Sequence, residues 1–213
     1  MTRPRVLLAD DHRIVAEGLK SILADEFEVC GFVEDGRALL EAAKKLEPQL
    51  IVADISMPHL NGIDALIQLK RDLPRIKVVF LTMHQELAYA RRALEAGASG
   101  FVLKHSAAAE LLAALRAAVA GKVYITPALA GEVFNAMRLR PKKAADPGAA
   151  LTNRQREILQ LLVEGQSAKQ IALALSISAR TVEFHKYQMM ESLGLHNSAE
   201  LIHFGIKNDI VGV

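Results

Sequence analysis

Leu50–Gly62 reads LIVADISMPHLNG, an apolar run that stops at an aspartate and continues into a loop. The first four residues are all hydrophobic, and Pro58 and Gly62 mark the segment after Asp54 as a turn-rich connection. A short apolar run bounded by turn residues is typical of a fully buried strand. We therefore predict a strand over Leu50–Ala53 that carries an acidic residue at its carboxyl end.

Similar apolar runs recur through the first 121 residues, and segments with helical spacing of apolar residues separate them. The predicted strands are Val6–Ala9, Val29–Val33, Leu50–Ala53, Val78–Leu81 and Phe101–Leu103. The predicted helices cover residues 12–24, 36–46, 63–73, 86–96 and 107–120. Strands that alternate with helices imply a parallel sheet covered on both faces. We expect a doubly wound, five-stranded α/β fold.

Charged and hydroxyl side chains follow four of these runs, namely Asp10 with Asp11, Asp54, Thr82 and Lys104. In a parallel sheet the carboxyl ends of all strands lie at one edge, where ligands bind. Two carboxylates about 4 Å apart repel by about 4 kcal/mol at an effective dielectric constant of about 20. Such a cluster calls for a cation, and Mg²⁺ prefers oxygen ligands and pairs with phosphate. The pattern predicts a magnesium site at this edge.

The remainder of the chain shows no strand pattern. A helix is predicted from Thr126 to about Leu139, with Pro127 in its first turn. Residues 140–150, RPKKAADPGAA, have the prolines and basic cluster of a flexible linker. Beyond it we predict four short helices, at roughly 152–163, 167–174, 178–193 and 198–206. The division is a first domain at 1–121, a helical extension and linker at 122–150, and an all-α domain at 151–213.

The second and third of these helices flank the short turn Leu175–Ile177, which is the arrangement of a helix-turn-helix. Thr152 and Ser178 stand where helix N-caps are expected. Helical spacing places Val182, His185, Met189 and Leu193 on one face, which we expect to face the core. The opposite face presents an aromatic pair, Phe184 and Tyr187, and such a pair on a solvent face indicates a partner.

In a helix-turn-helix the second helix enters the major groove of DNA. Phe184 suits a thymine methyl group and Glu183 can accept from cytosine, whereas Tyr187 or Lys186 suits a phosphate. The complete set of candidate DNA contacts is Ser178, Arg180, Thr181, Glu183, Phe184, Lys186, Tyr187 and Gln188.

Residues 1–121 resemble a receiver domain along their whole length, in the segments LLADDH, DISMPHLNG, FLTMH and GFVLK. The resemblance implies a flavodoxin-like fold in which Asp54 takes a phosphoryl group from a phosphohistidine of a sensor histidine kinase. It also implies that Lys104 and Thr82 bind the phosphoryl oxygens. The implied Mg²⁺ ligands are Asp11, Asp54 and the backbone carbonyl of Ser56, with Asp10 acting through water.

Some positions depart from the receiver pattern or vary within it. Phe101 occupies the aromatic switch position where tyrosine is common, so that Thr82 and Phe101 form the expected switch without a tyrosine hydroxyl. His105 follows Lys104 where many receivers have proline. Ser56 and His84 stand where the family tunes the lifetime of the phosphate.

Residues 151–205 resemble the DNA-binding domain of the NarL/FixJ (LuxR-type) regulators. The resemblance rests on Leu151-Thr152, Gly165, Ile171-Ala172, Ser178, Thr181-Val182, His185 and Leu193-Gly194. It departs at Gln155, where glutamate is usual, and at Ser192, where a basic residue is usual. The resemblance implies a transcription regulator that binds double-stranded DNA. We expect a homodimer after phosphorylation, formed through the final helix around Leu201, Ile202 and Ile206.

Charge leaves a second interpretation open for the helical domain. Residues 151–213 contain six basic and six acidic residues, whereas residues 138–150 contain four basic residues and one acidic residue. DNA-binding domains usually carry a basic surface. A phosphorylation-gated domain that binds a protein instead of DNA is therefore the alternative.

Other classes of protein fit less well. An aspartyl phosphatase needs a second carboxylate two residues after its nucleophile, and that position here is Ser56, so we do not expect an enzyme. The single cysteine, Cys30, and an amino terminus without a secretory pattern favour a cytoplasmic protein. The alanine-rich segment Ala107–Ala120 is interrupted by charges and is shorter than the ~20 residues that a membrane span needs.

Overall fold

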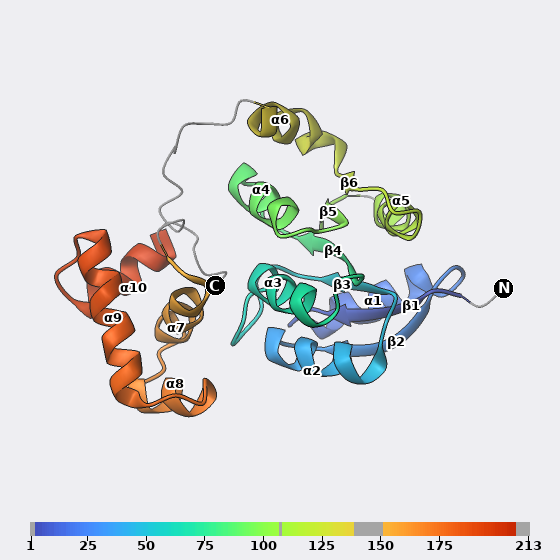
Figure 1. Ribbon diagram of the computed structural model, residues 1–213. Helices are drawn as coiled ribbons and strands as arrows, with labels where there is room; N and C mark the ends of the chain where they lie inside the picture. Colours follow the sequence, from blue (N-terminus) through green and yellow to red (C-terminus); the bar gives the residue numbers. More distant parts are fainter. Residues whose placement is uncertain (1–2, 107, 139–150, 208–213) are drawn as a thin grey trace. The chain divides into compact units, whose positions relative to one another are not determined.

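The run Leu50–Ala53 forms strand β3 in the middle of a six-stranded parallel sheet in the computed structural model (Figure 1). The other strands are β1 (Arg5–Ala9), β2 (Glu28–Val33), β4 (Lys77–Thr82), β5 (Gly100–Leu103) and β6 (Tyr124–Ile125). Their order in the sheet is β2-β1-β3-β4-β5-β6. The order of the first five strands is that of the flavodoxin-like doubly wound fold.

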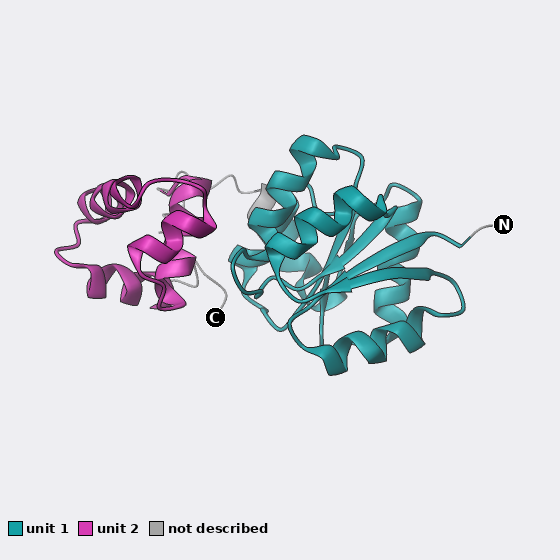
Figure 2. Cartoon of the chain, turned by 90° about the horizontal axis from the view of Figure 1, so that it is seen from below, with its two compact units in different colours: residues 1–142 teal, residues 143–213 magenta. Residues whose placement is uncertain are grey.

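The structure describes residues 3–106, 108–138 and 151–207. The chain divides into two compact units, residues 1–142 and residues 143–213 (Figure 2). The predicted linker, residues 140–150, lies outside the described residues.

The sequence prediction of five strands was one strand short. The sixth strand, β6, pairs in parallel with β5, with Gly100 beside Tyr124 and Phe101 beside Ile125. The next residue, Thr126, accepts a hydrogen bond at its hydroxyl from the Leu103 backbone N–H at 3.2 Å. A strand of two residues is too short to show an alternating pattern, so periodicity alone could not reveal it.

Helices cover both faces of the sheet, as the alternation of strands and helices predicted. The helices of this unit are α1 (Arg13–Leu23), α2 (Gly36–Leu46), α3 (Gly62–Asp72), α4 (Leu87–Glu95), α5 (Ala108–Val119) and α6 (Pro127–Arg138). Alternate residues of the strands point to opposite faces. Leu7 and Ile51 pack in one core cluster with residues of α2, α3 and α4, whereas Leu8 and Val52 pack in a second cluster with residues of α1 and α5.

Side-chain caps fix where two of these helices begin. Asp35 accepts from the backbone N–H groups of Arg37 and Ala38, each at 2.8 Å, at the start of α2. Asn61 accepts from the Asp64 N–H at 2.9 Å at the start of α3. These caps satisfy N–H groups that have no partner inside the helix. The Asn61 cap also ends the loop that begins at Asp54.

The second unit contains helices α7 (Asn153–Val163), α8 (Ala168–Ala174), α9 (Ala179–Leu193) and α10 (Ser198–Lys207). Its predicted helices were correct to within a residue or two. Three of them begin one residue later than predicted, since the predicted ranges counted the N-cap residues Thr152, Ser167 and Ser178. Thr152 and Ser178 are N-caps, as predicted. Gln155 completes a capping box, since its side-chain oxygen accepts from the Thr152 N–H at 2.8 Å.

Of the described helices, none has the length and hydrophobicity to cross a membrane.

We predict opposite effects of alanine at two glycines in helices. A methyl group at Gly36 would lie 1.9 Å from the carbonyl oxygen of Leu60, whereas one at Gly18 would meet no atom within 4 Å. Gly36→Ala should lower the free energy of unfolding by about 1–3 kcal/mol through overpacking. Gly18→Ala should raise it by about 0.5–1 kcal/mol through higher helix propensity. Urea unfolding followed by circular dichroism measures both, and equal effects would contradict the close approach of α2 to the loop after Asp54.

Candidate functional site

Three of the predicted site residues meet at the carboxyl edge of the sheet. Asp10, Asp54 and Lys104 follow β1, β3 and β5, and β4 lies between the last two strands. The Lys104 Nζ lies 2.7 Å from an Oδ2 atom of Asp10 and 2.7 Å from that of Asp54. Asp10 is 3% exposed and Asp54 is 5% exposed. The lysine thus bridges two buried carboxylates.

The surroundings of Lys104 favour its charged form. Burial, the largest single influence, lowers the pKa of Lys104, but the hydrogen bonds to Asp10 and Asp54 and the charges of both carboxylates together raise that pKa above its ordinary value. A positive charge is therefore retained inside this acidic cluster, where it offsets the repulsion between the carboxylates.

Backbone groups bind the second oxygen of each carboxylate. Asp54 Oδ1 accepts from the Ile55 N–H at 2.6 Å, and Asp10 Oδ1 accepts from the His12 N–H at 2.9 Å. The backbone around Asp54 is also fixed, because the Asp54 N–H donates to Ala9 at 2.8 Å. These hydrogen bonds hold Asp54 in one orientation.

Asp11 occupies the outer part of the cluster. Its side chain is 35% exposed, and the His12 Nδ1 lies 2.7 Å from its Oδ1. Asp10, Asp11 and His12 each offer one possible metal-ligand atom, and these three atoms lie within 4.8 Å of one another. Carboxylate oxygens are the ligands that Mg²⁺ prefers, so that the acidic donors of this cluster fit the predicted ion. His12 was not among the predicted site residues, although it directly follows the two aspartates.

Thr82 and Phe101 are both completely buried, on the adjacent strands β4 and β5. The Thr82 hydroxyl accepts from the His84 N–H at 3.2 Å, and the Lys104 N–H donates to the Thr82 carbonyl at 2.8 Å. Phe101 packs in the core cluster that contains Leu39 and Ala90. Thr82 is therefore connected through the backbone to the lysine that contacts Asp54.

Ser56 and His84 are hydrogen bonded to each other. Both were predicted to lie next to the site, but a contact between them was not predicted. The Ser56 Oγ lies 2.7 Å from the His84 Nε2. The His84 ring packs on Tyr89 with a centroid separation of 4.2 Å. This contact joins the loop after Asp54 to the loop after Thr82, and no periodic pattern in the sequence could have indicated it.

The second unit presents the predicted candidate surface on α9. Phe184 is 56% exposed and Tyr187 is 63% exposed, whereas Val182 and Met189 on the other face are fully buried. Arg180, Glu183 and Gln188 are also exposed. His185 and Leu193, predicted to face the core, are only partly buried. The helix thus displays two aromatic side chains on its outer face.

Four polar candidates on α9 interact mainly with one another. The Lys186 Nζ lies 3.1 Å from both carboxylate oxygens of Glu183. Ser178 accepts from the Thr181 N–H at 3.0 Å, and the two hydroxyl oxygens lie 2.8 Å apart. Glu183 and Lys186 neutralise each other, which weakens each as a separate contact for a base or a phosphate.

Two family models together match most of the chain. Residues 6–116 match the response regulator receiver domain, and residues 149–205 match the luxR family of bacterial regulatory proteins. The transcriptional regulatory protein MctR of Rhizobium johnstonii is 37% identical over 210 residues, which cover 97% of this chain and 95% of that protein. The response regulator UvrY of Escherichia coli K12 is 30% identical over 207 residues, or 96% of this chain and 94% of that protein.

Solved structures give the same relationship. RcsB from Salmonella enterica serovar Typhimurium, bound to the promoter P1flhDC in the presence of the phosphomimetic BeF3-, is 28% identical with a TM-score of 0.64. That similarity covers 95% of this chain and 98% of the RcsB chain. Another structure of the RcsB response regulator, from Salmonella typhimurium, has a TM-score of 0.67 at 28% identity and covers 98% of this chain and 99% of that one.

We predict that Lys104→Met lowers the free energy of unfolding by about 3 kcal/mol at neutral pH, because it leaves two buried carboxylates uncompensated. The exposed Lys122 provides the control, since Lys122→Met should change stability little. The pKa of Lys104 is raised by folding, so its stabilising contribution is present below about pH 10.4, its unfolded pKa, and is lost as the pH rises through the folded value. Urea unfolding at pH 7 and at pH 11 measures both effects. A pH-independent difference between wild type and Lys104→Met would contradict the prediction.

Proposed function

The chain belongs to the response regulators that join a receiver domain to a LuxR-type DNA-binding domain, and on that premise we propose that phosphorylation of Asp54 controls the binding of helix α9 to DNA. The observation that supports this most directly is the buried Asp54 carboxylate held 2.7 Å from Lys104. The family comprises transcriptional regulators rather than enzymes. A receiver domain implies a histidine kinase as phosphodonor, and a LuxR-type domain binds DNA.

In the proposed reaction an Asp54 oxygen attacks the phosphorus atom of a phosphohistidine on the kinase. The new bond joins Asp54 to phosphorus, the phosphorus–nitrogen bond breaks, and the electron pair of that bond leaves with the imidazole. Asp54 needs no general base, since it reacts as the carboxylate that Lys104 stabilises. The Lys104 ammonium then neutralises charge on the transferred group.

Receiver domains bind Mg²⁺ at an acidic cluster of this kind. We propose Asp10, Asp11, Asp54 and the Ser56 carbonyl as its ligands here. The bound ion would neutralise charge on the phosphoryl oxygens.

The phosphate must be detected by groups that interact differently with it in two states of the protein. We assign this role to Thr82, whose buried hydroxyl accepts from the His84 N–H at 3.2 Å. A phosphoryl group on Asp54 would offer that hydroxyl an acceptor for its own O–H proton. Phe101, fully buried on the neighbouring strand β5, would respond by repacking, because it has no hydroxyl of its own.

The helical unit is proposed to bind duplex DNA through the exposed face of α9. The luxR-family match favours DNA over the protein-partner alternative. Phosphorylation would also favour a homodimer, but one predicted contact of the dimer was wrong. Leu201 is fully buried in the core of its own unit, whereas Ile206 is 49% exposed and remains a candidate contact. We place the protein in the cytoplasm, where a bacterial regulator meets its DNA.

We predict that Asp54→Asn abolishes phosphorylation. Incubation with acetyl phosphate and Mg²⁺, followed by separation on a phosphate-affinity gel, measures the fraction modified. Asp25→Asn, at an exposed aspartate after α1, should behave as wild type. Phosphorylation of Asp54→Asn at the wild-type level would exclude Asp54 as the acceptor.

We predict that Phe184→Ala alters the order of preference among DNA sequences more than it alters affinity for non-specific DNA. An apolar contact with a base carries sequence information, and the side chain offers no group for a phosphate. Phe134→Ala truncates a similarly exposed phenylalanine on α6, outside the helical unit, and should leave the order of preference unchanged. Selection from a randomised DNA pool measures preference, and a uniform loss of binding by folded Phe184→Ala would contradict a base contact.

We predict that Thr82→Ala is phosphorylated but loses most of the increase in DNA affinity that phosphorylation produces. Coupling of about 1–3 kcal/mol corresponds to an increase of about 5–150-fold in the wild type. Thr82→Ser keeps the hydroxyl and should keep the increase. Binding curves with and without phosphate measure it, and a full response by Thr82→Ala would show that another group is the relay.

A further inference from the structure

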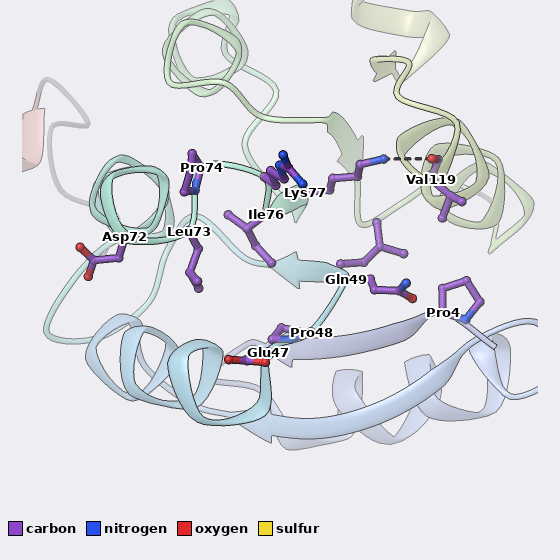
Figure 3. A pocket seen from close by; sticks show the side chains of 12 residues that line it. Pro4, Glu47, Pro48, Gln49, Asp72, Leu73, Pro74, Ile76, Lys77 and Val119 are labelled. Atoms are coloured by element: carbon purple, nitrogen blue, oxygen red, sulfur yellow. Dashed lines mark hydrogen bonds between the residues drawn. The ribbon is translucent and has the colours of Figure 1, made fainter. Parts of the chain in front are cut away.

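A cavity of about 560 Å³ lies at the edge of the sheet opposite Asp54 (Figure 3). Leu50 and Lys77, the first residues of β3 and β4, form its base. The loop before β3, the loop before β4, Pro4 ahead of β1 and Val119 at the end of α5 complete the lining. The volume is within the range of about 300–1,000 Å³ that is usual for small-molecule sites.

Most of the lining is apolar. Three prolines contribute to it, Pro4, Pro48 and Pro74, together with Leu73 and Ile76. Proline has no backbone N–H, so these positions offer little to a polar ligand but present rigid apolar rings. The interior therefore suits the hydrocarbon part of a ligand.

Three basic side chains lie in or next to the loop before β4, and none of them forms an ion pair among the described residues. They belong to Lys70, Arg75 and Lys77. Arg75 is exposed and makes no ion pair or hydrogen bond within the part of the chain that the structure describes. Lys77 donates to the Val119 carbonyl at 2.9 Å, and Lys70 donates to the Ile76 carbonyl at 2.7 Å. Burial and the nearby charge of Lys77 lower the pKa of Lys70. These cations repel one another and form no ion pair with an acidic side chain in the described part of the chain.

The two acidic residues of the lining, Glu47 and Asp72, form no ion pair with these cations within the residues that the structure describes. Asp72 is paired at 2.6 Å with Lys44, which is not one of the lining residues. Figure 3 shows Glu47 and Asp72 toward one end of the cavity and Gln49, Lys77 and Val119 toward the other. Gln49 accepts from the Arg5 N–H at 3.2 Å, and its amide nitrogen has no acceptor among the described residues. One end of the cavity therefore offers donors and positive charge.

We propose that this cavity binds a small organic carboxylate, with its apolar body against the prolines and Leu73 and its carboxylate near Arg75, Lys77 and Gln49. A neutral molecule of the same shape would leave the positive charge uncompensated and would bind more weakly. The site lies at the opposite edge of the sheet from Asp54.

Decanoate and decanol are suitable probes, because they share a hydrocarbon chain and differ in charge. Titration of the full-length ¹⁵N-labelled protein with each should show saturable shifts of the Gln49, Ile76 and Lys77 amides with decanoate, at a Kd below about 1 mM. Decanol should bind about tenfold more weakly. Equal affinities, or decanoate shifts that do not saturate at these amides, would overturn the proposal.

Two matched charge reversals test the role of Arg75. Arg75→Glu should weaken decanoate binding about tenfold, since it replaces an attraction by a repulsion of similar size. Arg71→Glu makes the same change of net charge at an exposed position outside the lining and should change the Kd less than about twofold. Unfolding curves would establish that both variants are folded. An equal effect of the two substitutions would show that decanoate binding depends only on the net charge of the protein. The proposed site would then be rejected.

Discussion

The contact of the Lys104 ammonium with two buried carboxylates is the interaction on which the first unit depends for its chemistry. Asp10 and Asp54 are almost inaccessible to water, and each lies 2.7 Å from the Lys104 Nζ. Without the lysine the two charges would repel and lose solvation together. With it, Asp54 is oriented and lies close to a cation. A nucleophilic carboxylate needs these conditions to accept a phosphoryl group.

The cluster forms because of the sheet order. Asp10, Asp54 and Lys104 are far apart in the sequence, but parallel strands bring their carboxyl ends to one edge, so their meeting could be predicted from apolar runs that each end in a polar residue. The contact between Ser56 and His84 could not, because it joins two irregular loops. Strand β6 could not be predicted either, because it forms by pairing with β5 and its sequence has no strand pattern of its own.

The two units pose different physical problems. The first concentrates charge and compensates it internally. The helical unit is electrically balanced, and on α9 Glu183 and Lys186 pair with each other. The exposed Phe184 and Tyr187 are then its most distinctive groups. On this account base contacts by apolar surface contribute more to DNA recognition than attraction to phosphates, and the exposed aromatic pair was predictable from helical spacing alone.

Chemical trapping of the phosphorylated protein tests the central assignment most directly. Borohydride reduces an aspartyl phosphate to homoserine, so that proteolysis and mass spectrometry identify the modified residue. After incubation with a phosphodonor and Mg²⁺, the account predicts homoserine at position 54 and unmodified aspartate at positions 10 and 11. Homoserine at position 10 or 11, with position 54 unchanged, would contradict the assignment of Asp54 as the residue that Lys104 holds ready for phosphate.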